Sequence, residues 1–357
     1  MKEKLIAVVV ISLLITAICA GLYKGEHEET FKATAATTEE EEYVEPADMK
    51  IGVCIYQFSD QFMSLYKDEI AKKLVEAGFS AENIEIVDSG GSQGYQNIQV
   101  KKFIEQGVDI LIINPVDTSG LGNITDLAVE SHIPLIYINR EPDGVEESRW
   151  EKNNWKVTYV GCDARQSGIL QGNIVVDIGK EKLDKNKDGV IQYVVIRGDK
   201  KNIDSYYRSR YSVEAMNEAG WTLECVANRI GNWDRNVSEF IVSRLYAERQ
   251  DIEVILCNND SMALGAIDAV KKNGLEPGKD VYIVGVDAVE EAVESVMNGE
   301  MAGTVLNNLF VQAHLTASAA RAYANGESVP YFNGSEYVKV TSENAASILE
   351  DIRSFDE

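Results

Sequence analysis

The sequence predicts an α/β protein built from two parallel-sheet lobes, on three observations. Short apolar runs rich in β-branched residues alternate with amphipathic segments from Met49 to the C-terminus. Each run is followed by a turn and a helical segment, which is typical of βαβ units with parallel strands buried on both faces. The number of such runs, in a chain of 357 residues, exceeds what a single doubly wound core usually holds.

The expected elements follow one another in a regular order. The first strand is predicted at Ile51 to Tyr56, and a helix follows over Phe62 to Gly78. One face of this helix is apolar, with Met63, Tyr66, Ile70 and Leu74. Further strands are expected at Ile84 to Val87, Ile110 to Ile113, Leu135 to Ile138, Thr158 to Val160, Ile191 to Ile196, Val254 to Cys257 and Val281 to Val284.

Residues 1–24 are expected to serve export. Lys2 and Lys4 precede a largely apolar run that ends at Leu22, a pattern typical of a secretory signal or a short membrane anchor. Cys19 lies near the end of this run, where bacterial lipoproteins place the cysteine that is lipidated, but Ile18 stands where a small residue is usual. Lipidation, ordinary cleavage and an uncleaved anchor therefore remain open.

Residues 25–48 are polar and acidic, with four consecutive glutamates at Glu39 to Glu42 and a proline at Pro46. A charged stretch with so few apolar residues does not pack into a core. We therefore expect an extended acidic linker between the export segment and the folded part.

The net charge, the cysteines and the N-terminal segment argue against a nucleic-acid-binding protein, a disulfide-rich protein and a transcriptional regulator. A net charge of −24 repels nucleic acid and offers no polybasic patch for anionic lipid. Five cysteines form an odd set, and Cys54, Cys162 and Cys257 lie in or beside apolar runs, so free buried thiols are expected instead of a disulfide framework. A transcriptional regulator would carry a helix-turn-helix where the export segment and linker stand.

An enzyme is not expected. The chain has three histidines, His27, His132 and His314, none of which belongs to a plausible nucleophile constellation or a zinc-binding spacing. A glycosidase needs two carboxylates facing each other across a glycosidic bond, a separation that residues alone do not measure. That class stays open at this point.

Planar polar side chains and aromatic rings gather just after the predicted strands, where open parallel sheets bind their ligands. They are Asp60, Phe62, Asn114, Asp204, Arg208, Asn259, Asp287 and Asn307. Trp233 is a further aromatic candidate, which with Phe62 would cover the two faces of a sugar ring. Asp, Asn and Arg each engage two adjacent sugar hydroxyls, and an aromatic ring stacks on the apolar face of a pyranose. Each residue alone also suits a helix cap, a turn or an i,i+4 ion pair, but their joint occurrence favours a sugar-binding cleft.

A second motif predicts a calcium loop. Asp184, Asn186, Asp188 and Gly189 follow the D-x-N-x-D-G spacing in which alternate oxygen side chains surround a hard cation. The twelfth position of the loop is Val195 instead of the usual glutamate, so a remote carboxylate must complete the shell. The alternative is a polar turn without a metal.

These stretches resemble the periplasmic galactose/glucose-binding proteins of the type I substrate-binding family, from Met49 to the C-terminus. The resemblance is carried by IGVCIYQFSDQFMS, ILIINPVD, YVGCDARQSGILQGN, DKNKDGVIQ, IEVILCNNDSMALGA, VGVDAVEEA and MAGTVLN. It implies two Rossmann-like lobes joined by a three-crossover hinge, and a monomer that binds D-galactose or D-glucose. It further implies delivery to the permease of an ABC transporter, with a chemoreceptor or sensor domain as a second partner.

The resemblance also assigns roles to the site residues. Asp60, Phe62 and Asn114 would bind sugar from the first lobe, the other strand-end residues from the second, with Asn307 near the hinge and Phe62 and Trp233 enclosing the ring. Asn202 stands where the family carries a histidine, which leaves the choice of hexose open. The implied calcium ligands are the side chains of Asp184, Asn186, Asp188, Gln192 and Glu253 and the carbonyl of Val190.

The family hinge implies three crossovers between the lobes. We expect them near His132 to Pro134, at Asn307 to Asn308 and around Val338 to Thr341. The first lobe would then comprise residues 49–132 and 309–340, and the second residues 133–308 and 341–357.

Overall fold

The computed structural model describes residues 44–354, which belong to one compact unit of the chain. The predicted export segment, Cys19 and most of the acidic linker lie outside the described residues. The folded part starts slightly earlier than expected, because Pro46–Asp48 form a short 3-10 helix and Nδ2 of Asn83 donates to the carbonyl of Ala47 at 2.8 Å. No helix within residues 44–354 is long and apolar enough to cross a membrane.

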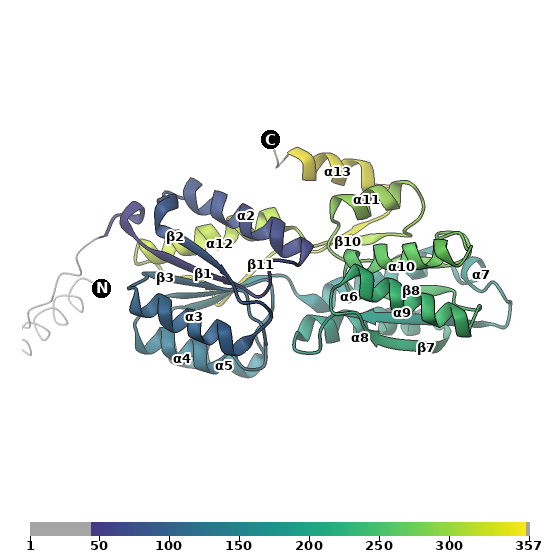
Figure 1. The fold of residues 1–357 in the computed structure, drawn as a ribbon, viewed down its shortest axis with the longest axis horizontal. Coiled ribbons are helices and arrows are strands. Elements are labelled where there is room, and N and C mark those ends of the chain that lie inside the picture. The colour runs from purple at the N-terminus through teal and green to yellow at the C-terminus, as the bar shows by residue number, and fades with distance from the viewer. Residues whose placement is uncertain (1–43, 355–357) are drawn as a thin grey trace, which may run out of the picture. The chain divides into compact units, whose positions relative to one another are not determined.

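The first lobe is a six-stranded parallel sheet in the order β11-β5-β4-β3-β1-β2 (Figure 1). Its strands are β1 (Ile51–Ile55), β2 (Ile84–Asp88), β3 (Ile110–Ile113), β4 (Leu135–Ile138), β5 (Val157–Gly161) and β11 (Phe332–Gly334). Helices α2 (Gln61–Glu76) and α12 (Leu309–Ala324) cover one face. The other face carries α3 (Gln93–Glu105), α4 (Gly122–Glu130) and α5 (Gly144–Asn153).

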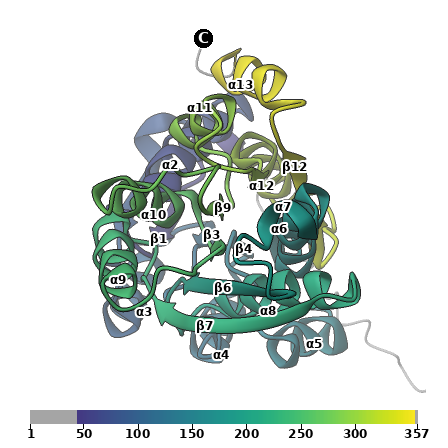
Figure 2. The same ribbon diagram turned by 90° about the vertical axis from the view of Figure 1, so that its right-hand side faces the viewer.

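The second lobe has a four-stranded parallel sheet in the order β7-β6-β8-β9, and an antiparallel pair β10-β12. The strands are β6 (Val190–Arg197), β7 (Thr222–Ile230), β8 (Val254–Cys257), β9 (Tyr282–Val284), β10 (Thr304–Leu306) and β12 (Val338–Val340). The helices are α6 (Ala164–Ile178), α7 (Lys180–Leu183), α8 (Ile203–Glu218), α9 (Arg235–Glu248), α10 (Asp260–Lys272), α11 (Glu290–Met297) and α13 (Ala345–Ser354). In Figure 2, α9 and α10 lie on one side of the lobe and α6 on the other.

The α/β prediction with two parallel lobes is confirmed, and local chemistry explains the elements. Strands β1, β3, β4 and β8 are buried at every position, as expected for parallel strands covered on both faces. The predicted apolar face of α2 is buried, and Asp60 caps this helix by accepting from the amide of Met63 at 2.9 Å. Ser92 caps α3 in the same way.

The expected crossover near His132 to Pro134 is wrong. Strand β4 pairs with β3 in parallel and β5 pairs with β4, so both strands belong to the first sheet. His132, at a φ of 59°, forms part of the turn that returns the chain from α4 to the same sheet. The chain first crosses at Cys162 and Asp163, between β5 and α6, so residues 133–161 belong to the first lobe. The strand pattern is identical in both lobes and does not tell which sheet a strand joins.

The other two crossovers lie at or close to their expected positions. The second is at Asn307 and Asn308, between β10 of the second lobe and α12 of the first. The third is at residues 335–337, because β11 pairs with β5 and β12 pairs with β10. Residues 338–340 therefore belong to the second lobe, and the lobe boundary lies a few residues before the expected one at residue 340.

The four cysteines of the described region are free. Cys54, Cys162 and Cys257 are buried and Cys225 is exposed. Burial raises the pKa of the Cys54 and Cys162 thiols to about 12, so both stay protonated at neutral pH.

Candidate ligand-binding site

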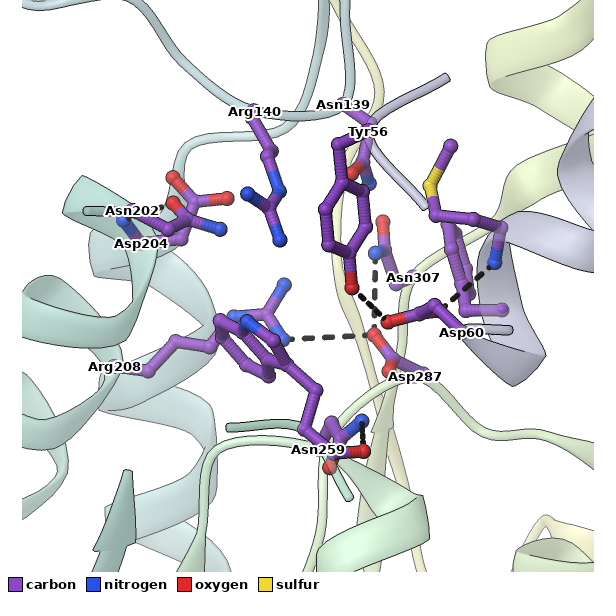
Figure 3. Close-up of a pocket in the computed structure, with 13 residues that line it drawn as sticks. Tyr56, Asp60, Asn139, Arg140, Asn202, Asp204, Arg208, Asn259, Asp287 and Asn307 are labelled. Carbon is purple, nitrogen blue, oxygen red and sulfur yellow. Dashed lines mark hydrogen bonds and ion pairs between the residues drawn. The ribbon is translucent and has the colours of Figure 1, made fainter. Parts of the chain in front are cut away.

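A polar pocket lies at the carboxyl ends of the strands, with side chains from both lobes around it (Figure 3). The space between them is about 320 Å³, including its mouth to solvent. The lining residues are Tyr56, Asp60, Phe62, Met63, Asn139, Arg140, Asn202, Asp204, Arg208, Trp233, Asn259, Asp287 and Asn307. Every predicted sugar-binding residue except Asn114 is among them.

On the first-lobe side, the start of α2 supplies Asp60 and Phe62. One carboxylate oxygen of Asp60 caps the helix, and the other accepts from the hydroxyl of Tyr56 at 2.5 Å. This hydrogen bond is drawn in Figure 3, where the Tyr56 ring stands beside Asp60. Phe62 is 6% exposed, so its ring is held within the lobe core while one side faces the pocket.

Asn114 does not line the pocket, contrary to the expectation. Its side chain accepts from the amide of Tyr56 at 3.2 Å and donates to the carbonyl of Ile138 at 3.1 Å. Nδ2 also lies 3.3 Å from Oδ1 of Asn139. These bonds tie together the ends of β1, β3 and β4, so Asn114 supports the pocket wall from behind.

Asn139 and Arg140 take the place that was expected for Asn114, and sequence reasoning missed both. They follow β4 directly, so the rule that ligands bind after the strand ends applies to them as well, but the expected lobe boundary places β4 in the second lobe. Asn139 has a φ of 62°, a conformation that the Tyr159 hydroxyl stabilises by donating to its carbonyl at 2.9 Å.

Arg140 connects the two lobes. Its guanidinium lies 3.4 Å from the centroid of the Tyr56 ring and donates to the carbonyl of Val116 at 3.2 Å, both in the first lobe. On the other side, Nη2 lies 3.3 Å from Oδ2 of Asp199 in the second lobe. The Arg140 side chain is almost completely buried and that of Asp199 is 24% exposed, so the contact is only partly shielded from water.

On the second-lobe side, α8 supplies Asp204 and Arg208, both buried. Arg208 donates to the carbonyl of Asn258 at 2.7 Å and lies 3.5 Å from Oδ1 of Asp287. Within residues 44–354, Oδ1 of Asp204 and Nε of Arg208 have no hydrogen-bond partner. Both residues line the pocket, so their carboxylate and guanidinium groups are the buried charges on this wall.

Asn202, Trp233 and Asn259 complete the second-lobe wall. Asn202 and Asn259 cap α8 and α10 through their side-chain oxygens. Trp233 has a φ of 66°, and its indole Nε1 donates to Asp199 at 3.2 Å. Only glycine fits beneath it, because a Cβ at Gly198 would lie 2.0 Å from the indole.

Asp287 and Asn307 close the pocket near the second crossover. Nδ2 of Asn307 donates to Oδ1 of Asp287 at 3.2 Å, as drawn in Figure 3. Burial raises the pKa of Asp287 to about 7, although Arg208 opposes the shift. Burial likewise raises the pKa of Asp204 to about 6, against the attraction of Arg208 and Arg140. Donors that bond these carboxylates would favour their ionised forms.

The predicted calcium loop folds around its own oxygen atoms. The amide of Asp188 donates to Oδ1 of Asp184 at 3.1 Å and to Oδ1 of Asn186 at 2.9 Å. Glu253 reaches the loop from the start of β8 and accepts from the amides of Lys185 and Gln192 at 2.6 and 3.1 Å. Across residues 44–354, no group of three or more His, Cys, Asp and Glu side chains is arranged to hold a metal ion, so a cation here would need amide and main-chain oxygens as well.

Two parallel-sheet lobes, three crossovers and a polar pocket at the strand ends define a two-lobed solute-binding protein. Comparison with known proteins agrees. The model of the periplasmic binding protein domain matches residues 51–328. The D-galactose/methyl-galactoside binding periplasmic protein MglB of Haemophilus influenzae is 36% identical over 79% of this chain and 83% of that protein.

More distant relatives share the same architecture. The ribose import binding protein RbsB of Bacillus subtilis is 26% identical over 84% of this chain and 91% of its own length. A solved ABC transporter solute-binding protein from Bacillus halodurans, with bound myo-inositol, is 26% identical with a TM-score of 0.74, over 86% of this chain and 99% of that chain.

The chain belongs to the periplasmic binding protein family, and it is a sugar-binding protein of the kind that serves ABC transporters. Membership of this family implies an exported protein. Its relatives bind solutes and are not enzymes, in agreement with the sequence prediction, and the glycosidase alternative is set aside.

Proposed function

We propose that the protein binds a hexose, D-galactose or D-glucose, and delivers it to the permease of an ABC transporter. The observation that carries this proposal is the pairing of two aromatic side chains, Phe62 and Trp233, with planar polar groups in one pocket. Aromatic faces suit the apolar faces of a pyranose, and the carboxylate, amide and guanidinium groups suit its hydroxyls. The relative named for D-galactose and methyl-galactoside supports a hexose over a pentose.

Two buried polar atoms without a partner among the described residues indicate that the ligand carries both hydrogen-bond donors and acceptors. Oδ1 of Asp204 accepts hydrogen bonds, and Nε of Arg208 donates one. A sugar hydroxyl both donates and accepts, so adjacent hydroxyls would satisfy this pair. Asn202 next to them can also donate, with a shorter reach than a histidine.

Closure of the two lobes would complete the site. The amide of Thr118 donates to the carbonyl of Lys201 at 3.0 Å, and Ser261 lies 3.1 Å from Oε1 of Gln61. Both contacts join the first lobe to the second. A ligand held by both lobes favours the closed arrangement, which is the form that a permease would recognise.

Calorimetric titration of residues 44–357 with glucose, galactose, ribose, xylose and myo-inositol tests the proposal. Tight binding of one hexose, with little heat from the pentoses and the inositol, is the expected result. Preference for a pentose or myo-inositol would replace the hexose proposal with another monosaccharide or polyol. An absence of binding to all five would overturn it.

We also propose that the loop at Asp184 to Gln192 holds a structural Ca²⁺, with Glu253 as the remote carboxylate. In support, the side chains of Asp184, Asn186 and Asp188 and both oxygens of Glu253 gather around this loop. A bound calcium ion would hold the loop against the start of β8 and stabilise the second lobe, and it would take no part in sugar recognition.

Chelation tests the calcium proposal. Removal of calcium should lower the melting temperature of the parent protein and leave Glu253→Gln much less affected, because binding to the native state alone stabilises it by mass action. Glu276→Gln, an exposed carboxylate of the same lobe, serves as the matched control. Equal responses of the parent and Glu253→Gln would count against the assigned ligand set.

A second possible role is that of a sensory protein, which presents its sugar to a chemoreceptor without transport. Measuring sugar uptake by a strain that lacks the gene distinguishes transport from sensing alone.

We further propose that Cys19 is lipidated and anchors the acidic linker at the membrane. Mass spectrometry of the N-terminal peptide decides between a diacylglyceryl cysteine, a signal cleaved elsewhere and an intact anchor.

A further inference from the structure

Tyr337 lies in the third crossover, between β11 and β12, and its side chain reaches back to the pocket. Its hydroxyl accepts a hydrogen bond from Nη2 of Arg208 at 3.1 Å. Tyr337 is 6% exposed and does not line the pocket itself. It belongs to the same buried core of the second lobe as Cys162 and Val305.

The backbone around Tyr337 is fixed independently of the hydroxyl. Its amide donates to Oε1 of Gln166 on α6 at 2.9 Å, and the amide of Ser335 donates to the carbonyl of Gly161 at 2.9 Å. The second of these bonds ties the third crossover to the end of β5, next to the first crossover. Burial raises the pKa of Tyr337 well above its usual range, so the hydroxyl stays neutral at physiological pH.

The guanidinium of Arg208 is held from several sides. Nη1 donates to the carbonyl of Asn258 at 2.7 Å and lies 3.5 Å from Asp287, while Nη2 donates to Tyr337. Nε alone remains without a partner among the described residues. Because a guanidinium is planar, fixing both terminal nitrogens also fixes the direction in which Nε donates.

We infer that Tyr337 is a positioning residue, whose hydroxyl orients the guanidinium of the pocket-lining residue Arg208 for the ligand. The inference rests on the proposed sugar-binding function. Since Tyr337 is part of the third crossover, the same bond links that crossover to the pocket. A residue of the hinge segment then takes part in ligand recognition through Arg208.

Tyr337→Phe tests the inference, because it removes the hydroxyl and keeps the buried ring. Titration of the exported protein with the preferred hexose should show an affinity about tenfold weaker, the effect of losing one hydrogen bond to a charged group. The loss should shrink to less than about threefold for the one deoxyhexose that lacks the hydroxyl contacted by Arg208. A merely structural role would weaken all deoxyhexoses by the same factor, and that result would overturn the inference.

The matched control is Tyr246→Phe. Tyr246 is a buried tyrosine of the same lobe whose hydroxyl has no hydrogen-bond partner within residues 44–354. This variant should keep the parent affinity for every sugar. Unchanged affinity in Tyr337→Phe as well would overturn the inference.

A ligand-free measurement separates this inference from the proposed function. The unfolding of Tyr337→Phe, Arg208→Gln and the double variant should be non-additive if the hydroxyl and the guanidinium interact, and additive if they do not. If the parent protein binds none of the sugars, the hexose proposal fails, but this cycle still decides whether Tyr337 positions Arg208. Additivity would overturn the inference whatever the ligand.

Discussion

Arg140 and Asp199 form an ion pair between the two lobes, with 3.3 Å between Nη2 and Oδ2. Each partner is also held in its own lobe: Arg140 by the ring of Tyr56, and Asp199 by the indole of Trp233. The pair therefore connects one wall of the pocket to the other, next to the proposed ligand.

Asp199→Asn should weaken sugar binding by about tenfold, because the charge that holds Arg140 across the cleft is lost while the side-chain volume stays the same. The loss should appear mainly as faster dissociation, since the closed form is the one that loses a contact. Stopped-flow measurement of dissociation rates provides the check. Asp126→Asn, which removes a surface ion pair with Arg149 within the first lobe, should leave the rate unchanged.

Trp233→Ala should weaken sugar binding at least a hundredfold, because ring stacking and water exclusion are lost together. Phe62→Ala should behave similarly from the other lobe. Calorimetric titration measures both, with Phe240→Ala as a control, since Phe240 is 67% exposed and does not line the pocket. Parent affinity in Trp233→Ala would disprove the aromatic sandwich.

Sugar affinity should rise with pH between about 5 and 8. The raised pKa values of Asp204, about 6, and Asp287, about 7, mean that both carboxyls are protonated at the lower end of this range. Sugar hydroxyls donate more strongly to carboxylates, so binding should release protons near pH 6.5. Calorimetry in two buffers of different ionisation enthalpy measures this release, and Asp287→Asn should reduce it. Proton uptake, or a flat profile, would contradict the prediction.

The free energy of unfolding of the sugar-free protein should fall as the pH rises, in contrast to the sugar affinity. Unfolded aspartates have pKa values near about 4, so the folded protein binds more protons than the unfolded chain between about pH 4 and 7. The contribution of Asp204 and Asp287 to the free energy of unfolding is therefore present below this window and is lost as the pH rises through it. Comparing urea unfolding of the parent protein with Asp287→Asn at pH 5 and pH 8 isolates this contribution.

Asn114→Ala should lower stability more than it lowers affinity. The substitution leaves the buried amide of Tyr56 without its side-chain partner, at a cost of about 1–3 kcal/mol. The carbonyl of Ile138 also loses one donor but keeps the amide of Arg140 at 2.7 Å. Asn139→Gly, which keeps the left-handed conformation of this position, should do the reverse and weaken sugar binding with a smaller change in melting temperature. If Asn114→Ala lost affinity while keeping full stability, Asn114 would contact the ligand after all.

The sequence alone determined the alternation of buried strands and helices, and with it the α/β class and the strand ends as the place for ligands. It located Asp60, Phe62, Asp204 and Arg208 at the pocket, because residues after parallel strands share one edge of a sheet whatever the details of packing. These features follow from local patterns with a fixed period, which a linear sequence displays directly.

Only the tertiary structure decided which sheet each strand joins. Strands β4 and β5 have the pattern of any other buried strand, but β4 pairs with β3 and β5 pairs with β4, so the first crossover lies at Cys162 and Asp163. That assignment made Asn139 and Arg140 pocket residues and left Asn114 as their support. Tyr337 is distant in sequence from Arg208, and only the hinge geometry brings them together. Such contacts depend on long-range pairing, which no local pattern encodes.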